Sequence, residues 1–291
     1  MNDLRTLRAA LLPDEPTQDA VDRSRHRLRN RMLTGRRKRV GPLALGAGLV
    51  AAAAAAIVVV VTLPGAPAVA PAPPQAVAPV VTGQDVLLAA ATVAERAPEG
   101  TGKYWHVTTQ AAEHLYENWT TADGHQWARG EKSGGRVVPL ARSFPLRLAA
   151  TDVTFDQIRA LPTDPTALRD WIVNALAHST ARTSAGPLTA KDREYMLIPS
   201  LVSLVSTLPA PPAVRAAAFR AIAAYPGVRG LGPVPGGQGL LLDDEDRLVV
   251  DPATGRVNQT SMFVTADGAI YRVPDGQGAA ISAEWTDVLP R

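Results

Sequence analysis

The sequence contains no cysteine, few aromatic residues and one long stretch without charge. Without cysteine the chain cannot form a disulfide framework, a thiolate zinc site or a cysteine nucleophile. Aromatic residues make up 5% of the 291 residues, whereas hydrophobic residues make up 46%, and much of that is alanine. We therefore expect a globular part whose core is built mainly from small aliphatic side chains.

Charge is distributed unevenly along the chain. Residues 1–40 contain eleven basic and five acidic residues, a net charge of +6, whereas the rest of the chain carries −3. The high pI therefore derives from the N-terminal segment, and it gives no argument that the whole chain binds nucleic acid. Because no aromatic or groove-reading motif accompanies the N-terminal arginines, we expect no nucleic-acid partner.

Residues 41–63 form a run of 23 uncharged and mostly apolar residues. At roughly 1.5 Å per residue, a helix of this length can cross a hydrocarbon core of ~30 Å. A cleaved signal peptide and a buried core helix are the alternatives. A signal peptide has an apolar region of about 7–15 residues behind a short basic segment, and a core helix of a small domain has a polar face. We therefore predict a transmembrane helix.

Basic residues flank only one end of this run. Arg36, Arg37, Lys38 and Arg39 precede it, and the next basic residue after it is Arg96. The positive-inside rule then places the N-terminus in the cytoplasm, so we predict a single-pass protein of the cell membrane. Its predicted parts are a cytoplasmic head (1–40), a transmembrane helix (41–63), a linker with six prolines (64–82) and an extracytoplasmic domain (83–291).

The head has helical character and a thin apolar stripe. Its apolar residues are Leu4, Leu7, Leu11, Val21, Leu28 and Met32. One hypothesis is that this stripe docks on a cytoplasmic partner such as a sigma factor. The other is that the head only sets the topology and contacts anionic lipids through Arg36, Arg37, Lys38 and Arg39.

Local signals predict the elements of the outer domain. Thr82 and Asp85 predict a capping box at the start of a helix that ends near Pro98. Strands are predicted at 103–110, 114–121, after the turn Asp123-Gly124, and at 136–144, where Pro139 indicates a sheet edge. Helices are predicted at 166–179, 192–208 (disturbed by Pro199) and 211–228. Further strands are predicted at 239–242, 247–251, 256–264, 269–273 and 280–289. This order predicts an α+β fold, an antiparallel sheet with helices on one face.

No motif of an established catalytic chemistry occurs in the sequence, so we expect neither an enzyme nor a cofactor. The acidic run 243–246 lacks the ligand spacing of a calcium loop and predicts a solvated turn. Residues 251–255 (DPATG) predict a hairpin turn. His106, His114 and His125 lie on neighbouring predicted strands, where a metal site and ordinary hydrogen-bonded histidines are both conceivable; we favour the latter and expect no metal.

Four features together resemble a group of actinobacterial single-pass membrane proteins of uncharacterised function. They are the basic head before the anchor and the segments "GKYWHVTT", "PPAVRAAAFRAIAAYPGV" and "LVVDPATGRV". Members of that group are often encoded beside extracytoplasmic-function sigma factors, and the layout is similar to that of transmembrane anti-sigma factors. The resemblance implies a regulator with an extracytoplasmic sensor or binding domain and implies no catalytic residues.

The strand pattern of the outer domain is also similar to the half-barrel of lipoprotein carriers. The alternative function is therefore an anchored extracytoplasmic binding or carrier protein, for an apolar ligand or an envelope component. In that case the head would only set the topology.

Overall fold

The computed structural model describes residues 81–140, 146–183, 186–243, 245–264, 270–273 and 278–289. These residues belong to one compact unit, Pro74–Arg291. The predicted head, with its six apolar residues and four flanking basic residues, and the predicted membrane helix lie outside the described residues. Among the helices that are described, none combines the length and the apolar character that a membrane span requires.

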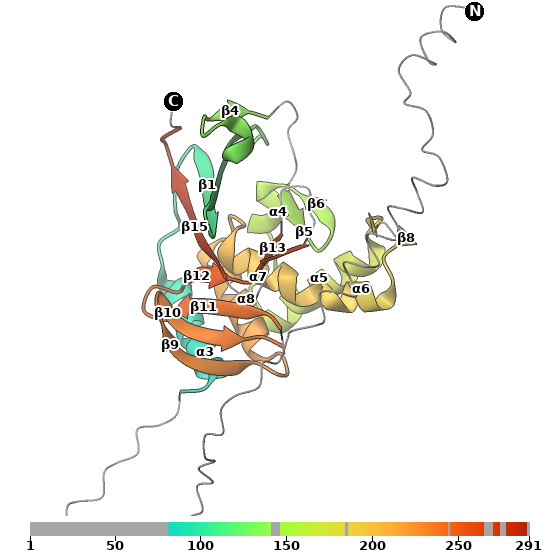
Figure 1. The fold of residues 1–291 in the computed structure, drawn as a ribbon. Helices are drawn as coiled ribbons and strands as arrows, with labels where there is room; N and C mark the ends of the chain where they lie inside the picture. The colour runs from blue at the N-terminus through green and yellow to red at the C-terminus, as the bar shows by residue number, and fades with distance from the viewer. Residues whose placement is uncertain are drawn as a thin grey trace, which may run out of the picture. The chain divides into compact units, whose positions relative to one another are not determined.

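A nine-stranded antiparallel sheet forms one layer of this unit (Figure 1). Its strand order is β4-β3-β2-β1-β15-β12-β11-β10-β9. The strands are β1 Tyr104–Ala111, β2 His114–Thr120, β3 Gln126–Arg129, β4 Val138–Pro139, β9 Arg229–Val234, β10 Gly237–Leu241, β11 Arg247–Asp251, β12 Arg256–Thr260 and β15 Ala279–Thr286. Three short hairpins lie outside it: β5 Leu146–Leu148 with β6 Thr151–Val153, β7 Arg182–Thr183 with β8 Gly186–Pro187, and β13 Met262–Val264 with β14 Ile270–Arg272.

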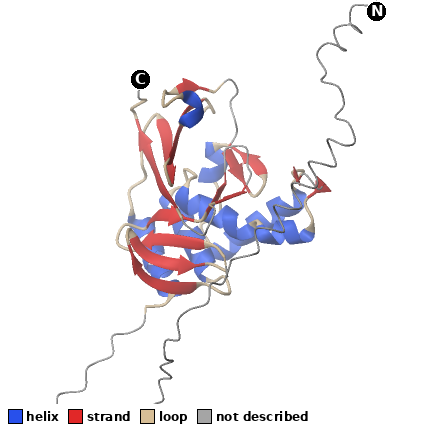
Figure 2. Cartoon of the chain, in the orientation of Figure 1, coloured by secondary structure: helices blue, strands red, loops and turns tan. Residues whose placement is uncertain are grey.

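The helices of the described residues are α3 Gly83–Arg96, α4 Phe155–Arg159, α5 Pro165–His178, α6 Ala190–Tyr195, α7 Leu197–Ser206 and α8 Pro212–Ala223, with a short 3-10 helix η1 at Glu131–Ser133. Helix α3 packs on strands β9–β11 of the large sheet and α7 on β12 and β15, whereas α5 and α6 extend away from the sheet (Figure 2). Helix α8 is central, because it packs against α3, α5 and α7. The core joins Leu87 of α3 and Phe219 of α8 to Leu248 and Val250 of β11, all of which are fully buried. The chain is therefore an α+β protein, as its sequence predicts.

The C-terminal strand β15 holds the two halves of the sheet together. Trp285 lies opposite Trp105 of β1, and Ala280 lies opposite Gln259 of β12. The strands β1–β4 lie in the chain between α3 and the other α-helices, and β9–β12 come after α8. Strand β15 thus joins two meanders into one sheet.

Several local predictions are confirmed. Thr82 caps α3: its Oγ1 accepts a hydrogen bond from the Asp85 backbone, and the Asp85 carboxylate accepts one from the Thr82 backbone. Gly124 has a φ of 88° in the turn between β2 and β3, a conformation that glycine adopts readily. Pro139 ends β4 at the edge of the sheet.

The prediction of one disturbed helix at 192–208 is wrong. Two helices, α6 and α7, meet at Met196, and Pro199 lies in the first turn of α7. The N–H groups of a first helical turn have no partner within the helix, so proline breaks no hydrogen bond there. In the sequence Pro199 suggested a disturbance inside one helix, whereas in the structure it marks the start of α7.

Two strand predictions also need correction, and several elements have no counterpart in the predictions. The strand predicted at 136–144 is reduced, among the described residues, to Val138–Pro139, because proline has no N–H to continue the ladder. The strand predicted at 256–264 ends at Thr260 and resumes at Met262, which pairs in a separate hairpin. Strand β9 and the short elements α4 and β5–β8 were not predicted, since β9 contains Gly230, Gly232 and Pro233 and lacks a regular alternation of apolar residues.

Candidate functional site

The candidate functional site in the described part of the chain is an open cleft at one end of the sheet, lined by charged and aromatic side chains. The cleft has a volume of about 380 Å³. Four segments distant in sequence meet there: the chain after α3, the start of α8, the turn before β12 and the end of β15. Its lining residues are Ala97–Thr101, Trp105, Arg159, Pro209–Pro212, Arg215, Thr254, Arg256 and Ala283–Trp285.

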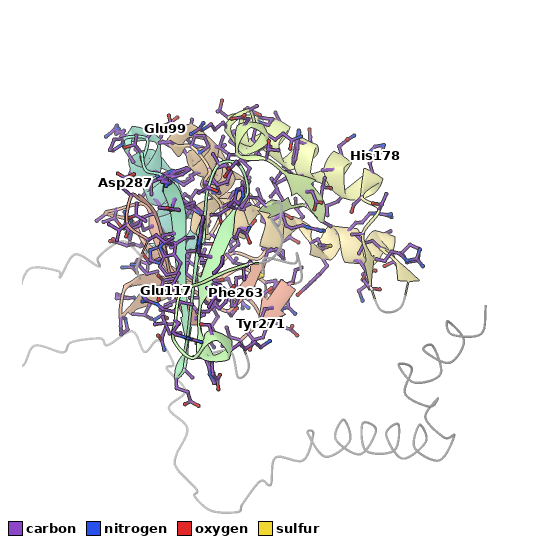
Figure 3. The ribbon with its side chains drawn as sticks, turned by 90° about the horizontal axis from the view of Figure 1, so that it is seen from above. Glu99, Glu117, His178, Phe263, Tyr271 and Asp287 are labelled. Carbon is purple, nitrogen blue, oxygen red and sulfur yellow. The ribbon has the colours of Figure 1, made fainter. Side chains whose placement is uncertain are left out.

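Local sequence explains how the walls of the cleft form. Helix α3 ends at Ala97, after which Pro98 and Gly100 turn the chain toward β15. Gly100 is needed at this point, because a Cβ atom there would lie 2.6 Å from Cδ1 of Trp285. Figure 3 labels Glu99 of this wall near Asp287, which follows β15, whereas His178 at the end of α5 lies on the other side of the view.

Aromatic side chains form the floor of the cleft. The rings of Trp105 and Trp285 pack edge to face with centroids 5.4 Å apart, and Phe155 lies 5.6 Å from Trp285. The indole Nε1 of Trp105 donates a hydrogen bond of 2.7 Å to the carbonyl oxygen of Thr207. Trp105 is therefore fixed between the sheet and the C-terminal end of α7. Trp105 thus belongs both to a small core cluster and to the lining of the cleft.

Two arginines from different elements face this cleft. Arg215 lies in the first turn of α8, and Arg256 begins β12. A smaller recess of about 60 Å³ adjoins the cleft, and both arginines, with Trp105, line both spaces. The recess is otherwise lined by polar and apolar residues and by no acidic side chain: Val205, Ser206, Leu208, Val257, Asn258, Ile281, Ser282 and Ala283.

Neither arginine has a counter-ion among the described residues. The Nε of Arg215 is shielded from solvent and has no hydrogen-bond acceptor. Burial, and then the positive charge of Arg256, lower the pKa of the Arg215 guanidinium. By contrast, Arg159 at the outer rim lies 3.8 Å from carboxylate oxygens of both Glu99 and Asp156. The half-buried Arg215 and the exposed Arg256 thus lack the carboxylate partners that Arg159 has.

The start of α8 adds to this positive potential. No side chain caps the helix, whose first residues are Pro212 and Ala213. The N-terminal end of a helix carries a partial positive charge, which disfavours a basic residue such as Arg215 in the first turn. The sequence could have indicated this site. Arg215 follows three nearby prolines and occupies a position in the first helical turn where a carboxylate is normally favoured.

Two polar side chains of the recess, Asn258 and Ser206, are already engaged within the protein. Asn258 Nδ2 donates to the Gly236 carbonyl at 2.7 Å, and Ser206 Oγ donates to the Val202 carbonyl at 2.6 Å. Thr254 Oγ1 donates to Asp251 in the predicted DPATG turn, which is confirmed. The guanidinium groups are therefore the charged donors left for a ligand.

The three strand histidines do not come together. His106 Nε2 lies 3.2 Å from Glu117, His114 pairs with Glu131 at 3.2 Å, and His125 pairs with Asp123 at 3.0 Å. Within the described ranges no group of three His, Cys, Asp or Glu residues could hold a metal ion.

His106 instead belongs to a closed network on the sheet face opposite Trp105. Its ring stacks on Trp119 with centroids 4.5 Å apart, and the guanidinium of Arg129 lies over the same indole. Glu117, which is buried, accepts hydrogen bonds from both Arg129 and His106. Since each charged group has its partner within the network, the network stabilises the sheet and offers no free group to a ligand.

The acidic turn at 243–246 is only partly a solvated turn. Asp243 accepts hydrogen bonds from the backbones of Glu245 and Asp246, as a turn residue does. Asp246, however, is 2% exposed and lies 2.7 Å from Nη2 of Arg272 in β14. The prediction is wrong for Asp246 because the β13–β14 hairpin, which the local sequence does not reveal, folds over it.

The comparisons add no relative. The chain matches no protein-family model, no curated protein and no solved structure.

Proposed function

We propose that the chain is a single-pass, membrane-anchored regulatory protein whose extracytoplasmic domain binds a ligand and whose head acts on a cytoplasmic partner. The observation that carries the binding role is the cleft with Arg215 and Arg256. Two like charges without counter-ions are unfavourable in a ligand-free protein, and a bound ligand removes that disadvantage. The lining contains no histidine or cysteine, so we propose binding rather than catalysis.

The membrane and regulatory parts of this proposal rest on the sequence. Residues 41–63 have the length of a membrane span, and the basic residues 36–39 orient it with the head inside. The partner we propose is a sigma factor, by the resemblance to anti-sigma layouts. Leu4, Leu7, Leu11, Val21, Leu28 and Met32 would form its docking stripe.

An apolar carrier of half-barrel type is the weaker alternative. Such a carrier needs an empty space between its sheet and its helices. Here Leu201 and Leu204 of α7 and Phe219 of α8 are fully buried between them, and the recess beside α7 measures only about 60 Å³. An acyl chain held between the sheet and the helices, as in a half-barrel carrier, would have to displace these side chains.

Co-purification tests the regulatory role. The full-length chain, solubilised in a neutral detergent, should capture an extracytoplasmic-function sigma factor of the same cell at micromolar concentration. Replacing Leu4, Leu7 and Leu11 with serine should abolish capture without affecting membrane insertion, because the apolar stripe is lost while the basic flank remains.

A head exchange separates the two functions. If the head is replaced by another basic segment that sets the same topology, a regulator loses sigma-factor capture and a carrier keeps its whole activity. Absence of capture by the unmodified chain, or equal capture by the triple-serine variant, would refute the proposed docking.

A further inference from the structure

We infer that the cleft binds a phosphomonoester group between Arg215 and Arg256, presented either by a soluble phosphate ester or by the headgroup of phosphatidic acid. This inference rests on the proposed function, since it names the ligand class of that same cleft. It is carried by the charge balance of the recess, the donor groups that remain free there, and the shape of the adjoining cleft.

Charge balance favours phosphate over a single carboxylate. The recess is lined by two guanidinium groups and no acidic residue. A carboxylate would neutralise one of these charges and leave the other uncompensated. A phosphate monoester carries a charge of about −1.5 to −2 at pH 7, which matches the pair.

The free donors also suit phosphate. A guanidinium presents its N–H groups in a planar fork that pairs with two phosphate oxygens at once, and Arg215 and Arg256 reach the recess from different elements. The uncapped start of α8, a helix of 12 residues, adds a third source of positive potential beside Arg215. Phosphate has enough oxygens to pair with both guanidinium groups.

The outer cleft then accommodates the organic part of the ester. Its volume of about 380 Å³ lies within the usual range of small-molecule sites, roughly 300–1,000 Å³. Its floor is the edge-to-face pair Trp105–Trp285, and its rim is lined by Pro98, Pro211 and Pro212. Glu99 of the lining is paired with Arg159, so the cleft suits one phosphate on an uncharged or apolar body.

Isothermal titration of the full-length chain in a neutral detergent tests this inference. Phenyl phosphate is the soluble-ester probe, short-chain phosphatidic acid below its micelle concentration is the headgroup probe, and benzoate is the matched carboxylate. We expect a phosphate probe to bind at least about 10-fold more tightly than benzoate. The stronger of the two phosphate probes identifies the source.

Charge-matched variants complete the test. Arg215→Gln and Arg256→Gln should each weaken phosphate binding by about 10- to 100-fold, because each removes a charge-assisted pair of hydrogen bonds. Arg169→Gln is the control, since Arg169 is an exposed arginine on α5 outside the lining of the cleft, and it should leave affinity unchanged.

The outcomes distinguish this inference from the proposed function. Benzoate binding as tightly as the phosphate probes, with the same dependence on both arginines, overturns the phosphate assignment and leaves a ligand-binding domain. Phosphate binding that is absent, or that is indifferent to both arginines, overturns the site itself. Sigma-factor capture is measured separately and decides the regulatory role whichever result is obtained. If Arg215→Gln does not fold, the exposed Arg256 still provides the decisive variant.

Discussion

Replacing Arg215 with methionine should stabilise the ligand-free protein. The wild-type side chain keeps a buried Nε–H without an acceptor, and its guanidinium lies in the field of Arg256. Methionine has a similar length and a flexible apolar chain, so it can follow the same path along α8 without a charge. The substitution thus removes the unsatisfied Nε–H and the repulsion by Arg256, and it adds apolar contact.

The magnitude follows from the burial of the side chain. A buried donor without a partner costs roughly 1–3 kcal/mol. Arg215 as a whole is only half-buried, so part of its guanidinium remains hydrated and the gain falls at the lower end. We expect about 1–2 kcal/mol, which for a unit of this size raises Tm by roughly 2–8 °C.

Tryptophan fluorescence provides a suitable assay. All five tryptophans of the chain lie in the described unit, so their signal during urea or thermal unfolding reports on that unit alone. The matched control is Arg220→Met on the same helix. Arg220 forms an ion pair with Glu95 of α3, so its loss should be neutral or destabilising by up to ~1 kcal/mol.

The sign of the two changes is the test. Opposite effects of the same substitution at positions 215 and 220 would support an uncompensated cation in the cleft. A clear loss of stability in Arg215→Met would show that the guanidinium makes favourable interactions in the ligand-free state, and the reasoning would fail. At a saturating phosphate concentration the wild type should become more stable than Arg215→Met, because the wild type gains binding free energy that this variant lacks.

Two further predictions concern the packing around the sheet. Gly255→Ala should destabilise the protein by about 2 kcal/mol or more in urea unfolding, because the residue has φ +62° and a Cβ would lie 2.9 Å from the Ala90 carbonyl oxygen; an unchanged midpoint would contradict that packing. Burial raises the pKa of the Asp246 carboxyl and Arg272 opposes the rise. The buried Asp246 carboxyl needs Arg272 only when it is ionised, and its ionised fraction grows with pH. Arg272→Ala should therefore lose more stability at pH 7 than at pH 4, and an equal loss at both would refute the pairing.

Elements with strong local signals could be predicted from the sequence. The capping box of Thr82 and Asp85, the Asp123-Gly124 turn and the proline that opens α8 depend on atoms within four residues of each other. Such interactions form wherever the same residues follow one another, so the pattern alone indicates them. The α+β class followed from their order along the chain.

The sequence could not indicate the strand order or the weak elements. Strand β9 has too little apolar alternation to be recognised, and it exists because β10 offers it a pairing edge. Asp246 reads as a surface residue until the hairpin with Arg272 covers it. These features depend on partners far away in the chain.

The candidate site shows the same division most clearly. The sequence by itself determined the element that carries Arg215 and the turn that precedes Arg256. Only the tertiary structure brought both arginines to one recess, because that required α8 to pack on the sheet while β15 joined its two halves. Local propensity fixes where a helix begins, but the meeting of two like charges is decided by the packing of the whole unit, which holds them together against their repulsion.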